Sequence, residues 1–339
     1  MTQIGEVAEP NVLKSIPSPH LPARRHCLDL DDYSRQEIEA VLQNATVMKD
    51  VMHREIRKVP ALRGKSIVTL FYEPSTRTRV SFEQAGKILS ADVINVSSSG
   101  SSAEKGESLY NTALTLQSME ADIIIVRHPD SGAPNFLARH LNASIINAGD
   151  GSHAHPTQAL VDLYTMASHA DRLEGLRVAI VGDIQHSRVA RSNLWGLTKM
   201  GASVVLCAPP TLMPIDFLGG HHSRSNNPFT SVEIETSIER ALEGADVVMA
   251  LRLQKERQDA GNLPSLREYS RLYGLTPKLL EKARTSVIVM HPGPMNEGVE
   301  IDPAVAHGPM SVIEEQVANG VAVRMAVLYG LVPATRHRD

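Results

Sequence analysis

Cysteine is scarce in this sequence of 339 residues, which contains only Cys27 and Cys207. These two residues lie far apart along the chain and provide neither a disulfide framework nor a cysteine-rich zinc site, so we expect a reducing, cytoplasmic environment. The apolar runs are also short, Ile123–Val126 being typical of the longest, whereas a membrane-spanning helix needs about 20 apolar residues. The N-terminal residues lack the apolar core of a signal peptide. These absences predict a soluble intracellular protein that has no membrane partner.

A strong excess of either charge is also absent. The chain has 34 Lys+Arg against 38 Asp+Glu, which gives a formal net charge of −4. A dedicated nucleic-acid-binding protein carries a clear basic excess, so we do not expect nucleic acid as a partner. The composition is otherwise ordinary for a globular protein, with 42% hydrophobic residues. The length fits two domains of about 100–200 residues each.

Short apolar runs alternate with longer amphipathic stretches from residue 28 onward. We expect strands in two sets of four, at 66–71, 92–96, 122–127 and 144–147, and at 177–182, 203–207, 246–251 and 286–290. Most are rich in Ile and Val without polar alternation, which is typical of parallel strands covered on both faces. Helical patterns lie between them, at 80–89, 107–119, 157–168, 189–200 and 237–243. This order predicts an α/β fold of two similar lobes, each a parallel sheet flanked by helices.

The remaining segments are expected to connect or close these lobes. Residues 1–26 are Pro-rich and aperiodic, which predicts a flexible N-terminal arm. Residues 208–230 and 254–273 are expected to be mobile surface loops. A last helical pattern at 311–329 could close either lobe by packing back across the boundary, which we place inside the helix at 157–169.

The first strand is followed by residues 72–79, with the sequence YEPSTRTR, which open a helix. In open α/β sheets, ligands bind beyond the carboxyl ends of the strands. A helix N-terminus presents free backbone N–H groups and a positive dipole end, and hydroxyls and guanidinium groups add further donors for phosphate. Ser75, Thr76, Arg77 and Thr78 therefore predict a phosphate site rather than an ordinary capped helix.

Arg127 and His155 follow two further strands of the same set. Arg127 is interpreted either as a second anion contact or as a simple solvent boundary. His155 precedes Pro156 at a helix start and could polarise a carbonyl group, with Gln158 on the same helix face. A zinc site at His153 and His155 is disfavoured because no third ligand of suitable spacing accompanies them.

The second set of strands also ends in polar residues. Arg188 follows the strand at 177–182, but the G-x-G-x-x-G pattern of a dinucleotide site is absent. Arg252 ends a later strand, where a solvated charged loop is an equally good interpretation. The turn at 291–294, with the sequence HPGP, could expose backbone groups. The sequence shows no Walker, Ser-His-Asp or H-E-x-x-H motif. We therefore expect no metal and no cofactor. We expect instead a cleft whose cationic side chains bind a phosphate and one or two carboxylates and hold the reacting groups next to each other.

Together these motifs resemble those of the carbamoyltransferase family, from about residue 28 to residue 333. Residues 71–79, FYEPSTRTR, are similar to its carbamoyl-phosphate motif, and 127–129 and 155–158 are similar to its other shared elements. Residues 252–257, RLQKER, resemble the loop of the aspartate-specific branch. The ornithine-specific branch instead carries a D-x-x-x-S-M-G loop and an H-C-L-P turn, and this sequence has neither.

The resemblance implies transfer of the carbamoyl group of carbamoyl phosphate to the amine of L-aspartate, which gives N-carbamoyl-L-aspartate and phosphate in pyrimidine biosynthesis. It implies a carbamoyl-phosphate-binding domain at 27–160, completed by a C-terminal helix at 309–339, and an aspartate-binding domain at 161–308. It also implies a homotrimer with active sites in the cleft between the lobes and at the subunit interface. Regulatory or dihydroorotase-like chains are the partners expected in a larger assembly.

The resemblance also implies roles for individual residues. Carbamoyl phosphate would be bound by Ser75, Thr76, Arg77, Thr78, Arg127, His155, Gln158, Pro292, Gly293 and Pro294. The catalytic residues would be Arg77, Thr78, Lys105, Arg127 and His155. Aspartate would be bound by Lys105, Arg188, Arg252 and Gln254. The residues reaching in from a neighbouring subunit would be Ser101 and Lys105. Glu297 stands where arginine is usual in this branch.

Two other functions remain open at this point. One is a carbamoyltransferase that acts on ornithine or on an acylated amino acid. The other is a non-catalytic anion-binding subunit, which would be expected to lose Arg77 or His155. For the catalytic interpretation we expect His155 to act as a neutral donor, because an imidazolium would compete with the arginines for phosphate.

Overall fold

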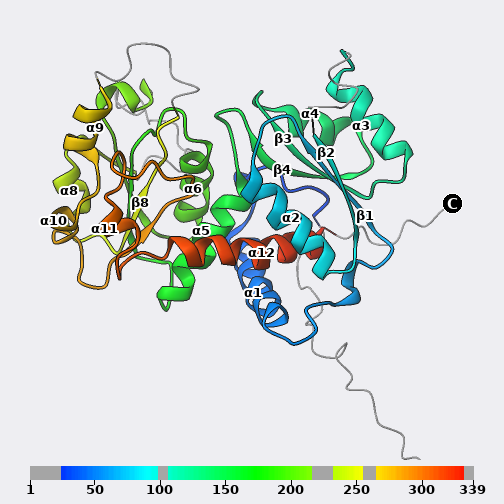
Figure 1. The fold of residues 1–339 in the computed structure, drawn as a ribbon, viewed down its shortest axis with the longest axis horizontal. Coiled ribbons are helices and arrows are strands. Elements are labelled where there is room, and N and C mark those ends of the chain that lie inside the picture. The colour runs from blue at the N-terminus through cyan, green and yellow to red at the C-terminus, as the bar shows by residue number, and fades with distance from the viewer. Residues whose placement is uncertain (1–23, 98–105, 216–231, 255–264, 332–339) are drawn as a thin grey trace, which may run out of the picture.

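The computed structural model describes residues 24–97, 106–215, 232–254 and 265–331. Within these ranges the strands form two separate, entirely parallel sheets (Figure 1). The first sheet has the order β2-β1-β3-β4, with β1 (Ser66–Phe71), β2 (Asp92–Ser97), β3 (Ile123–His128) and β4 (Ser144–Asp150). The second has the order β7-β6-β5-β8-β9, with β5 (Arg177–Val181), β6 (Ser203–Cys207), β7 (Glu233–Glu235), β8 (Val247–Ala250) and β9 (Ile288–Met290). The predicted fold of two similar α/β lobes is confirmed.

The apolar runs form the core of each lobe. The residues of Ile123–Val126 in β3 are all buried, and so are the central residues of β5 and β8. Helices cover the sheets, which explains why these strands need no polar face. The longer helices are α1 (Arg35–Met52), α2 (Thr76–Ile88), α3 (Leu109–Ser118), α4 (Ala133–His140), α5 (Pro156–His169), α6 (Arg188–Lys199), α9 (Leu266–Tyr273) and α12 (Ile313–Gly330). Short helical turns are η2 (Pro60–Leu62), η4 (Pro210–Leu212), α8 (Ile238–Leu242), α10 (Pro277–Leu280) and α11 (Pro303–Ala306).

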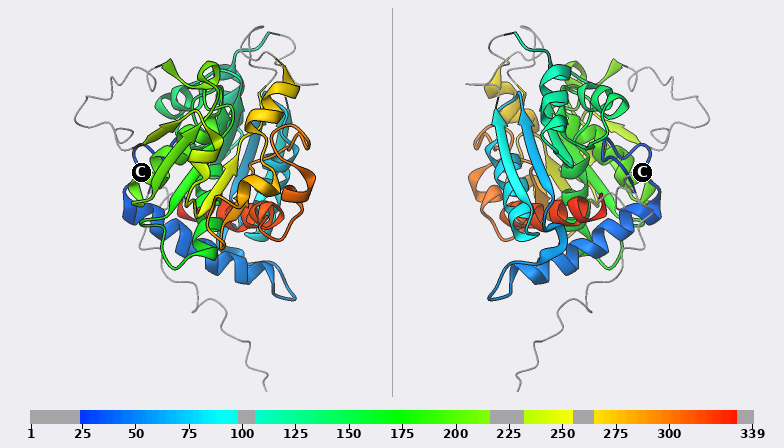
Figure 2. Two further views of the ribbon diagram at one scale, coloured as in Figure 1. Left: turned by 90° about the vertical axis from the view of Figure 1, so that its left-hand side faces the viewer. Right: turned by 90° about the vertical axis from the view of Figure 1, so that its right-hand side faces the viewer.

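Helices α5 and α12 lie along the junction of the two sheets (Figure 1). α12 packs against α1, α2 and α5, and Figure 2 shows it in red beside α1 in blue. α5 in turn packs against β4 of the first sheet and α6 of the second. The predicted C-terminal helix therefore packs back against earlier elements. The exact domain boundaries stay a prediction.

Several elements in the structure have no counterpart among the predicted ones, among them α1, α4 and β7. α1 begins at a capping box in which Glu37 N donates to Ser34 Oγ and Ser34 N donates to the Glu37 side chain. α4 begins after Gly132, which has a left-handed backbone. β7 has only three residues and a partly exposed face, so its apolar signal is too short to recognise.

The prediction of a mobile loop at 254–273 is wrong for its last part. Residues 266–273 form α9, whose N-cap Ser265 accepts a hydrogen bond from Glu268 N. Tyr269 and Tyr273 are buried, and this aromatic burial stabilises a segment that is otherwise highly charged. In the other predicted loop, residues 210–212 form a 3₁₀ turn and Leu212 is buried. Residues 216–231 and 255–264 lie outside the described residues, as do 1–23 of the predicted arm.

Both cysteines are buried and neither forms a disulfide. Burial raises the pKa of each thiol to about 12, which keeps both protonated and unreactive. No helix in the described ranges has the length and apolar character needed to cross a membrane.

Candidate active site

A cavity of about 790 Å³ opens between the two lobes. Its walls come from segments at the carboxyl ends of β1, β3, β4, β5, β8 and β9, together with α12. The predicted site residues that line it are Ser75, Thr76, Arg77, Thr78, Arg127, His155, Gln158, Arg188, Arg252, Gln254, Pro292, Gly293 and Pro294. The fold thus brings both halves of the predicted site to one cavity. Ser101 and Lys105 lie outside the described residues.

The start of α2 is built differently from an ordinary capped helix. Its N-cap residue Ser75 has an extended backbone, and its side chain makes no capping hydrogen bond. Ser75 Oγ donates instead to Thr78 Oγ1 at 2.9 Å. The first N–H groups of the helix are therefore not capped by the Ser75 side chain, in a position where the helix dipole favours an anion.

Arg77 packs against the turn that follows β9. A Cβ atom at Gly293 would lie 2.7 Å from Arg77 Cζ, and Gly293 has φ +66°. Both observations require glycine at this position. Burial lowers the pKa of Arg77, and the nearby charge of Arg252 acts in the same direction. Arg252 follows a strand of the other sheet, so guanidinium groups from both lobes face the same space.

Glu73 joins the two lobes and was not singled out by the sequence analysis. Its Oε2 accepts from Arg188 Nη2 at 2.6 Å and lies 3.2 Å from Arg127 Nη2. Arg127 belongs to the first sheet, whereas Arg188 opens α6 beside the second. The sequence could have pointed to Glu73, because it is an acidic residue within a motif that is rich in arginine and follows a strand. Glu73 keeps the two guanidinium groups near each other by lowering their mutual repulsion.

The end of β4 and the residue that follows it support both of these arginines. Arg127 Nη1 donates to the carbonyl of Ala148, and Arg188 Nη1 donates to the carbonyl of Gly151 at 3.2 Å. A Cβ atom at Gly149 would lie 2.9 Å from Arg188 Cζ, so a larger residue would push this guanidinium aside.

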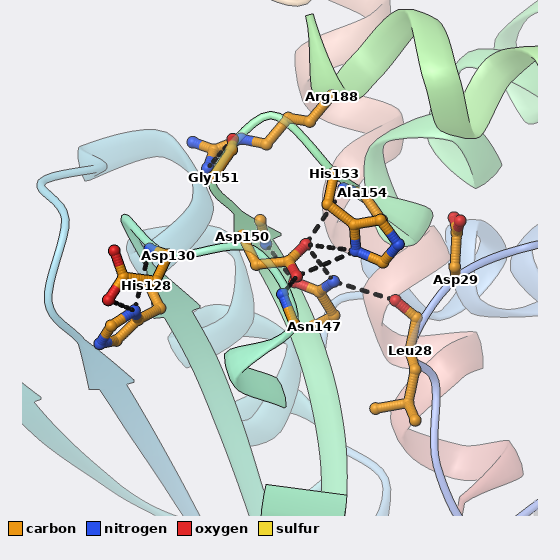
Figure 3. A network of polar contacts seen from close by, with 12 residues as sticks. Leu28, Asp29, His128, Asp130, Asn147, Asp150, Gly151, His153, Ala154 and Arg188 are labelled. Carbon is orange, nitrogen blue, oxygen red and sulfur yellow. Dashed lines mark hydrogen bonds and ion pairs between the residues drawn. The ribbon is translucent and has the colours of Figure 1, made fainter. Parts of the chain in front are cut away.

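Asp150, the last residue of β4, holds this segment in place, as Figure 3 shows. Its buried carboxylate accepts from Asn147 Nδ2 at 2.8 Å, from Ala154 N at 3.1 Å and from Gly132 N at 2.6 Å. His153 also hydrogen-bonds to Asp150, so its imidazole serves the loop rather than a site shared with His155. The described ranges contain no group of three His, Cys, Asp or Glu side chains placed to hold a metal ion.

His155 is buried at the N-cap of α5. Burial lowers its pKa well below the ordinary value, and the charges of Arg127, Arg188 and Arg324 act in the same direction. Its imidazole is therefore neutral at pH 7, as predicted. The backbone N–H of His155 donates to Ser192 Oγ, which fixes the helix start. Its Nδ1 is buried and has no hydrogen-bond partner in the described part of the chain.

Asp183 positions the residues that follow β8. Its Oδ2 accepts from Gln254 N at 3.2 Å, and its Oδ1 accepts from His186 N at 3.2 Å. A single buried carboxylate thus joins the segment after β5 to the segment after β8. Gln254 is held at the cavity through its backbone, which leaves its side-chain amide to a ligand.

Two further cavity residues, Gln316 and Arg324, were missed by the sequence analysis. Both lie on α12, whose buried residues are mostly apolar. Burial lowers the pKa of Arg324 to about 10, so it stays charged at pH 7. Its guanidinium lies over the Phe82 ring, 5.2 Å from the centroid. Polar residues within an apolar helical pattern were the signal that could have identified them.

Family comparisons agree with this division of the cavity. Residues 25–168 match the carbamoyl-phosphate-binding domain of the aspartate/ornithine carbamoyltransferases. Residues 174–331 match the aspartate/ornithine-binding domain of the same family.

Individual relatives cover almost the whole chain. The aspartate carbamoyltransferase catalytic subunit of Roseiflexus sp. is 59% identical over 308 residues, which are 91% of this chain and 95% of the relative. An aspartate transcarbamoylase of Trypanosoma cruzi, solved with N-(phosphonacetyl)-L-aspartic acid, is 30% identical with a TM-score of 0.84, covering 93% of this chain and 98% of that one. The ornithine carbamoyltransferase of Pyrococcus furiosus is 28% identical with a TM-score of 0.81, covering 93% of this chain and 99% of that one.

Proposed function

The chain belongs to the aspartate/ornithine carbamoyltransferase family, and we propose how its own cleft residues perform the aspartate-specific reaction. The enzyme is an aspartate carbamoyltransferase: it joins the carbamoyl group of carbamoyl phosphate to the amine of L-aspartate and releases phosphate. The observation that supports this assignment most directly is the single cavity that joins the start of α2 to Arg188, Arg252 and Gln254. One end suits a phosphate, and the other suits the carboxylates of a diacid.

The phosphate of carbamoyl phosphate binds at the start of α2. Ser75, Thr76 and Thr78 supply hydroxyl groups, and the first turn supplies backbone N–H groups. Arg77 supplies a charged fork that can bond two phosphate oxygens at once. The charge of the departing phosphate grows as the C–O bond breaks, so these donors stabilise the transition state more than the bound substrate.

The carbonyl oxygen of the carbamoyl group points toward Thr78, Arg127 and His155. Attack by the amine builds negative charge on this oxygen, and donors held in fixed positions stabilise that charge. Removing one such donor typically costs about 3–4 kcal/mol of barrier. The neutral imidazole of His155 donates without competing for the phosphate, and the leaving phosphate itself accepts the amine proton.

Aspartate binds on the side of the second lobe, where Arg188, Arg252 and Gln254 receive its carboxylates. The carbamoyl NH₂ group is bound by Gln158 and by backbone groups of Pro292, Gly293 and Pro294. Binding both substrates side by side pays the entropy of association before the chemical step. No protein nucleophile is needed.

A neighbouring subunit completes the site with Ser101 and Lys105, so that the active unit is a homotrimer. Two observations support a subunit contact at this edge. β2 is the outer strand of the first sheet and leads directly to residues 98–105. Val80 and Ile94, on α2 and β2, expose 49% and 52% of their surface, and Val80 also lines the cavity. Exposed apolar side chains at a sheet edge suit an interface.

The product fits pyrimidine biosynthesis, which is part of the same proposal. A cytoplasmic location and a larger assembly with regulatory or dihydroorotase-like chains stay predictions. Glu297, which replaces the usual arginine, lies at the surface and pairs with His307 Nε2 at 3.3 Å.

The experiment that tests this function measures carbamoyl transfer to aspartate and to ornithine. The wild-type protein should use aspartate, because two guanidinium groups suit a diacid and not a second amine. Arg252→Ala should raise the KM of aspartate about 10- to 100-fold, the equivalent of one charge-assisted hydrogen bond. Arg77→Ala should instead raise the KM of carbamoyl phosphate and lower kcat. Equal damage to both KM values in both variants would refute the assignment of the two ends of the cavity, and transfer to ornithine alone would refute the aspartate-specific function.

A further inference from the structure

One buried carboxylate on α5 has no role in the reaction described above. Asp162 lies one helical turn after Gln158 and is fully buried. Its Oδ1 accepts from Gln158 Nε2 at 2.9 Å and from Gln316 Nε2 at 2.7 Å, and its Oδ2 accepts from Asn193 Nδ2 at 2.7 Å. These partners come from α5, α12 and α6. A single residue therefore ties together three helices behind the cavity.

The first contact fixes which end of the Gln158 amide faces the cavity. A side-chain amide carries a donor and an acceptor of similar size, and either orientation fits the same space. A carboxylate only accepts hydrogen bonds, so Asp162 binds the NH₂ end of Gln158. The carbonyl oxygen of Gln158 is thus left for the cavity that this residue lines. Such an oxygen can accept a hydrogen bond from a ligand NH₂ group.

The second contact extends the same control to the turn after β9. Gln316 also donates its NH₂ group to Asp162, which leaves its carbonyl oxygen to accept from His291 N at 3.1 Å. His291 Nδ1 in turn accepts from Gly293 N at 2.8 Å. Because the NH₂ group of Gln316 is bound to Asp162, it does not compete with a ligand for the backbone carbonyls of this turn. The turn and Gln158, which together form the proposed NH₂ site, depend on one carboxylate.

The charge of Asp162 is compensated where it lies. Burial raises its pKa to about 6, against the hydrogen bonds from Asn193, Gln158 and Gln316 and the charge of Arg324. It is therefore ionised at pH 7 and acts as an acceptor only. Burying a carboxylate is costly unless it is fully hydrogen-bonded, so a role in the site is a reason for its presence among these helices.

We propose that Asp162 is a positioning residue which makes the cavity select an acyl phosphate bearing an NH₂ group over one bearing a methyl group. This inference rests on the proposed function, since it assigns the NH₂ site of carbamoyl phosphate. It differs from a general structural role because its effect is on ligand choice. Phosphate binding at the first turn of α2 should not depend on it, because the hydrogen-bond donors to Asp162 lie on α5, α6 and α12.

The experiment compares carbamoyl phosphate with acetyl phosphate, in which a methyl group replaces the NH₂ group. Calorimetric Kd values are measured for both compounds and for inorganic phosphate, so the comparison does not require turnover. The wild-type protein should prefer carbamoyl phosphate. Asp162→Ala should reduce the preference about tenfold. Without the carboxylate, the Gln158 and Gln316 amides are no longer held in one orientation, and the expected loss is about one net hydrogen bond to the ligand. The Kd of inorganic phosphate should remain within about twofold, because no group in the first turn of α2 is altered.

Two control variants separate orientation from charge and from packing. Asp162→Asn should keep most of the preference, because the side-chain oxygen of the new Asn can still accept from both glutamines. Its NH₂ group would face Asn193, whose amide can turn its oxygen toward it. Asn193 Oδ1 has no hydrogen-bond partner in the described ranges. Asn193→Ala removes a donor to the same carboxylate without touching either glutamine, and it should leave the preference unchanged. If Asp162→Ala does not fold, Gln316→Met removes the link to the turn and should lose part of the preference.

The outcomes are distinct. The inference is overturned if the folded Asp162→Ala variant keeps the wild-type preference, or if Asp162→Asn loses it to the same extent as Asp162→Ala. It is also overturned if all three Kd values change equally, which would indicate a general loss of structure. A wild-type protein that binds carbamoyl phosphate but transfers nothing to aspartate would instead refute the proposed function.

Discussion

At the residue scale, the protonation state of His155 follows from its surroundings and not from its residue type. Three arginines and full burial oppose a positive charge on the imidazole. The same shift affects folding, because the unfolded chain binds a proton below pH of about 6.5 that the folded His155 does not bind. The contribution of His155 to the stability is therefore complete above that pH and is lost as the pH falls.

Asp29 and Asp162 act in the opposite direction. Burial raises the pKa of each to about 6, so the folded state binds their protons more readily than the unfolded state does. Their ionisation therefore lowers the free energy of unfolding as the pH rises from the ordinary pKa of 3.8 to about 6. The pH dependence of the whole protein is thus a difference of opposing terms, and activity is the clearer readout for His155.

We predict that His155→Ala lowers kcat about 10²- to 10³-fold without changing the shape of the pH profile between pH 6 and pH 8.5. A neutral imidazole has no proton to gain in that range, so its removal deletes a donor but no titration. The measurement is kcat/KM against pH for both proteins, with Gln158→Ala as the comparison for loss of an uncharged contact. A limb present in the wild type and missing in the variant would contradict a permanently neutral His155.

At the element scale, two helices with serine at the N-cap show different uses of the same residue. Ser34 caps α1 through a complete capping box. Ser75 makes no capping bond at α2 and lines the cavity instead. The sequence pattern of a polar residue before a helix does not distinguish these two roles, because the difference lies in the direction of the side chain.

We predict opposite effects for the two alanine substitutions. Ser34→Ala should lower the free energy of unfolding by about 1 kcal/mol and leave kcat/KM unchanged. Ser75→Ala should lower kcat/KM for carbamoyl phosphate and change the stability much less, since no cap is lost. Chemical denaturation and steady-state kinetics on both variants check this, with Ser34→Thr as a control that keeps the hydroxyl group. An activity loss of equal size in both variants would contradict the distinction.

At the scale of the whole molecule, the cavity is shared between lobes and, by our proposal, between subunits. Glu73 joins Arg127 of one lobe to Arg188 of the other. The exposed Val80 and Ile94 mark the edge at which a neighbour would approach. Complete sites would then form only in the assembled trimer.

We predict that two inactive variants recover activity when they are mixed. Lys105→Ala and Arg77→Ala homotrimers should each be nearly inactive, because every site lacks one cation. After dissociation and random reassembly, about a quarter of the sites draw both intact residues from two different chains. Activity should recover to roughly that fraction of wild type. Absence of recovery, in trimers shown by mass spectrometry to have exchanged subunits, would refute the shared site.

Much of the fold and of the site could be predicted from the sequence alone. Parallel strands buried on both faces leave a continuous Ile/Val signal, and their carboxyl ends meet at one edge of each sheet. Arg77, Arg127, His155, Arg188 and Arg252 could therefore be placed near strand ends, but for Arg127 and Arg252 the position alone did not separate a ligand contact from a solvated charge. The sequence determined these because hydrophobic period and strand-end placement are local properties of the chain.

Only the tertiary structure decided which polar residues serve one another. Asp162 and Gln316 are 154 positions apart in the sequence, and no local pattern relates them. α9 was missed because its stability comes from burying Tyr269 and Tyr273, which a highly charged sequence does not reveal. The neutrality of His155 could be predicted because an imidazolium would compete with the arginines for phosphate, but its physical cause is the burial of the imidazole, to which the charges of three arginines add. Such features depend on long-range packing, because electrostatic and hydrogen-bond energies are set by what lies nearby in space and not by what lies nearby in the chain.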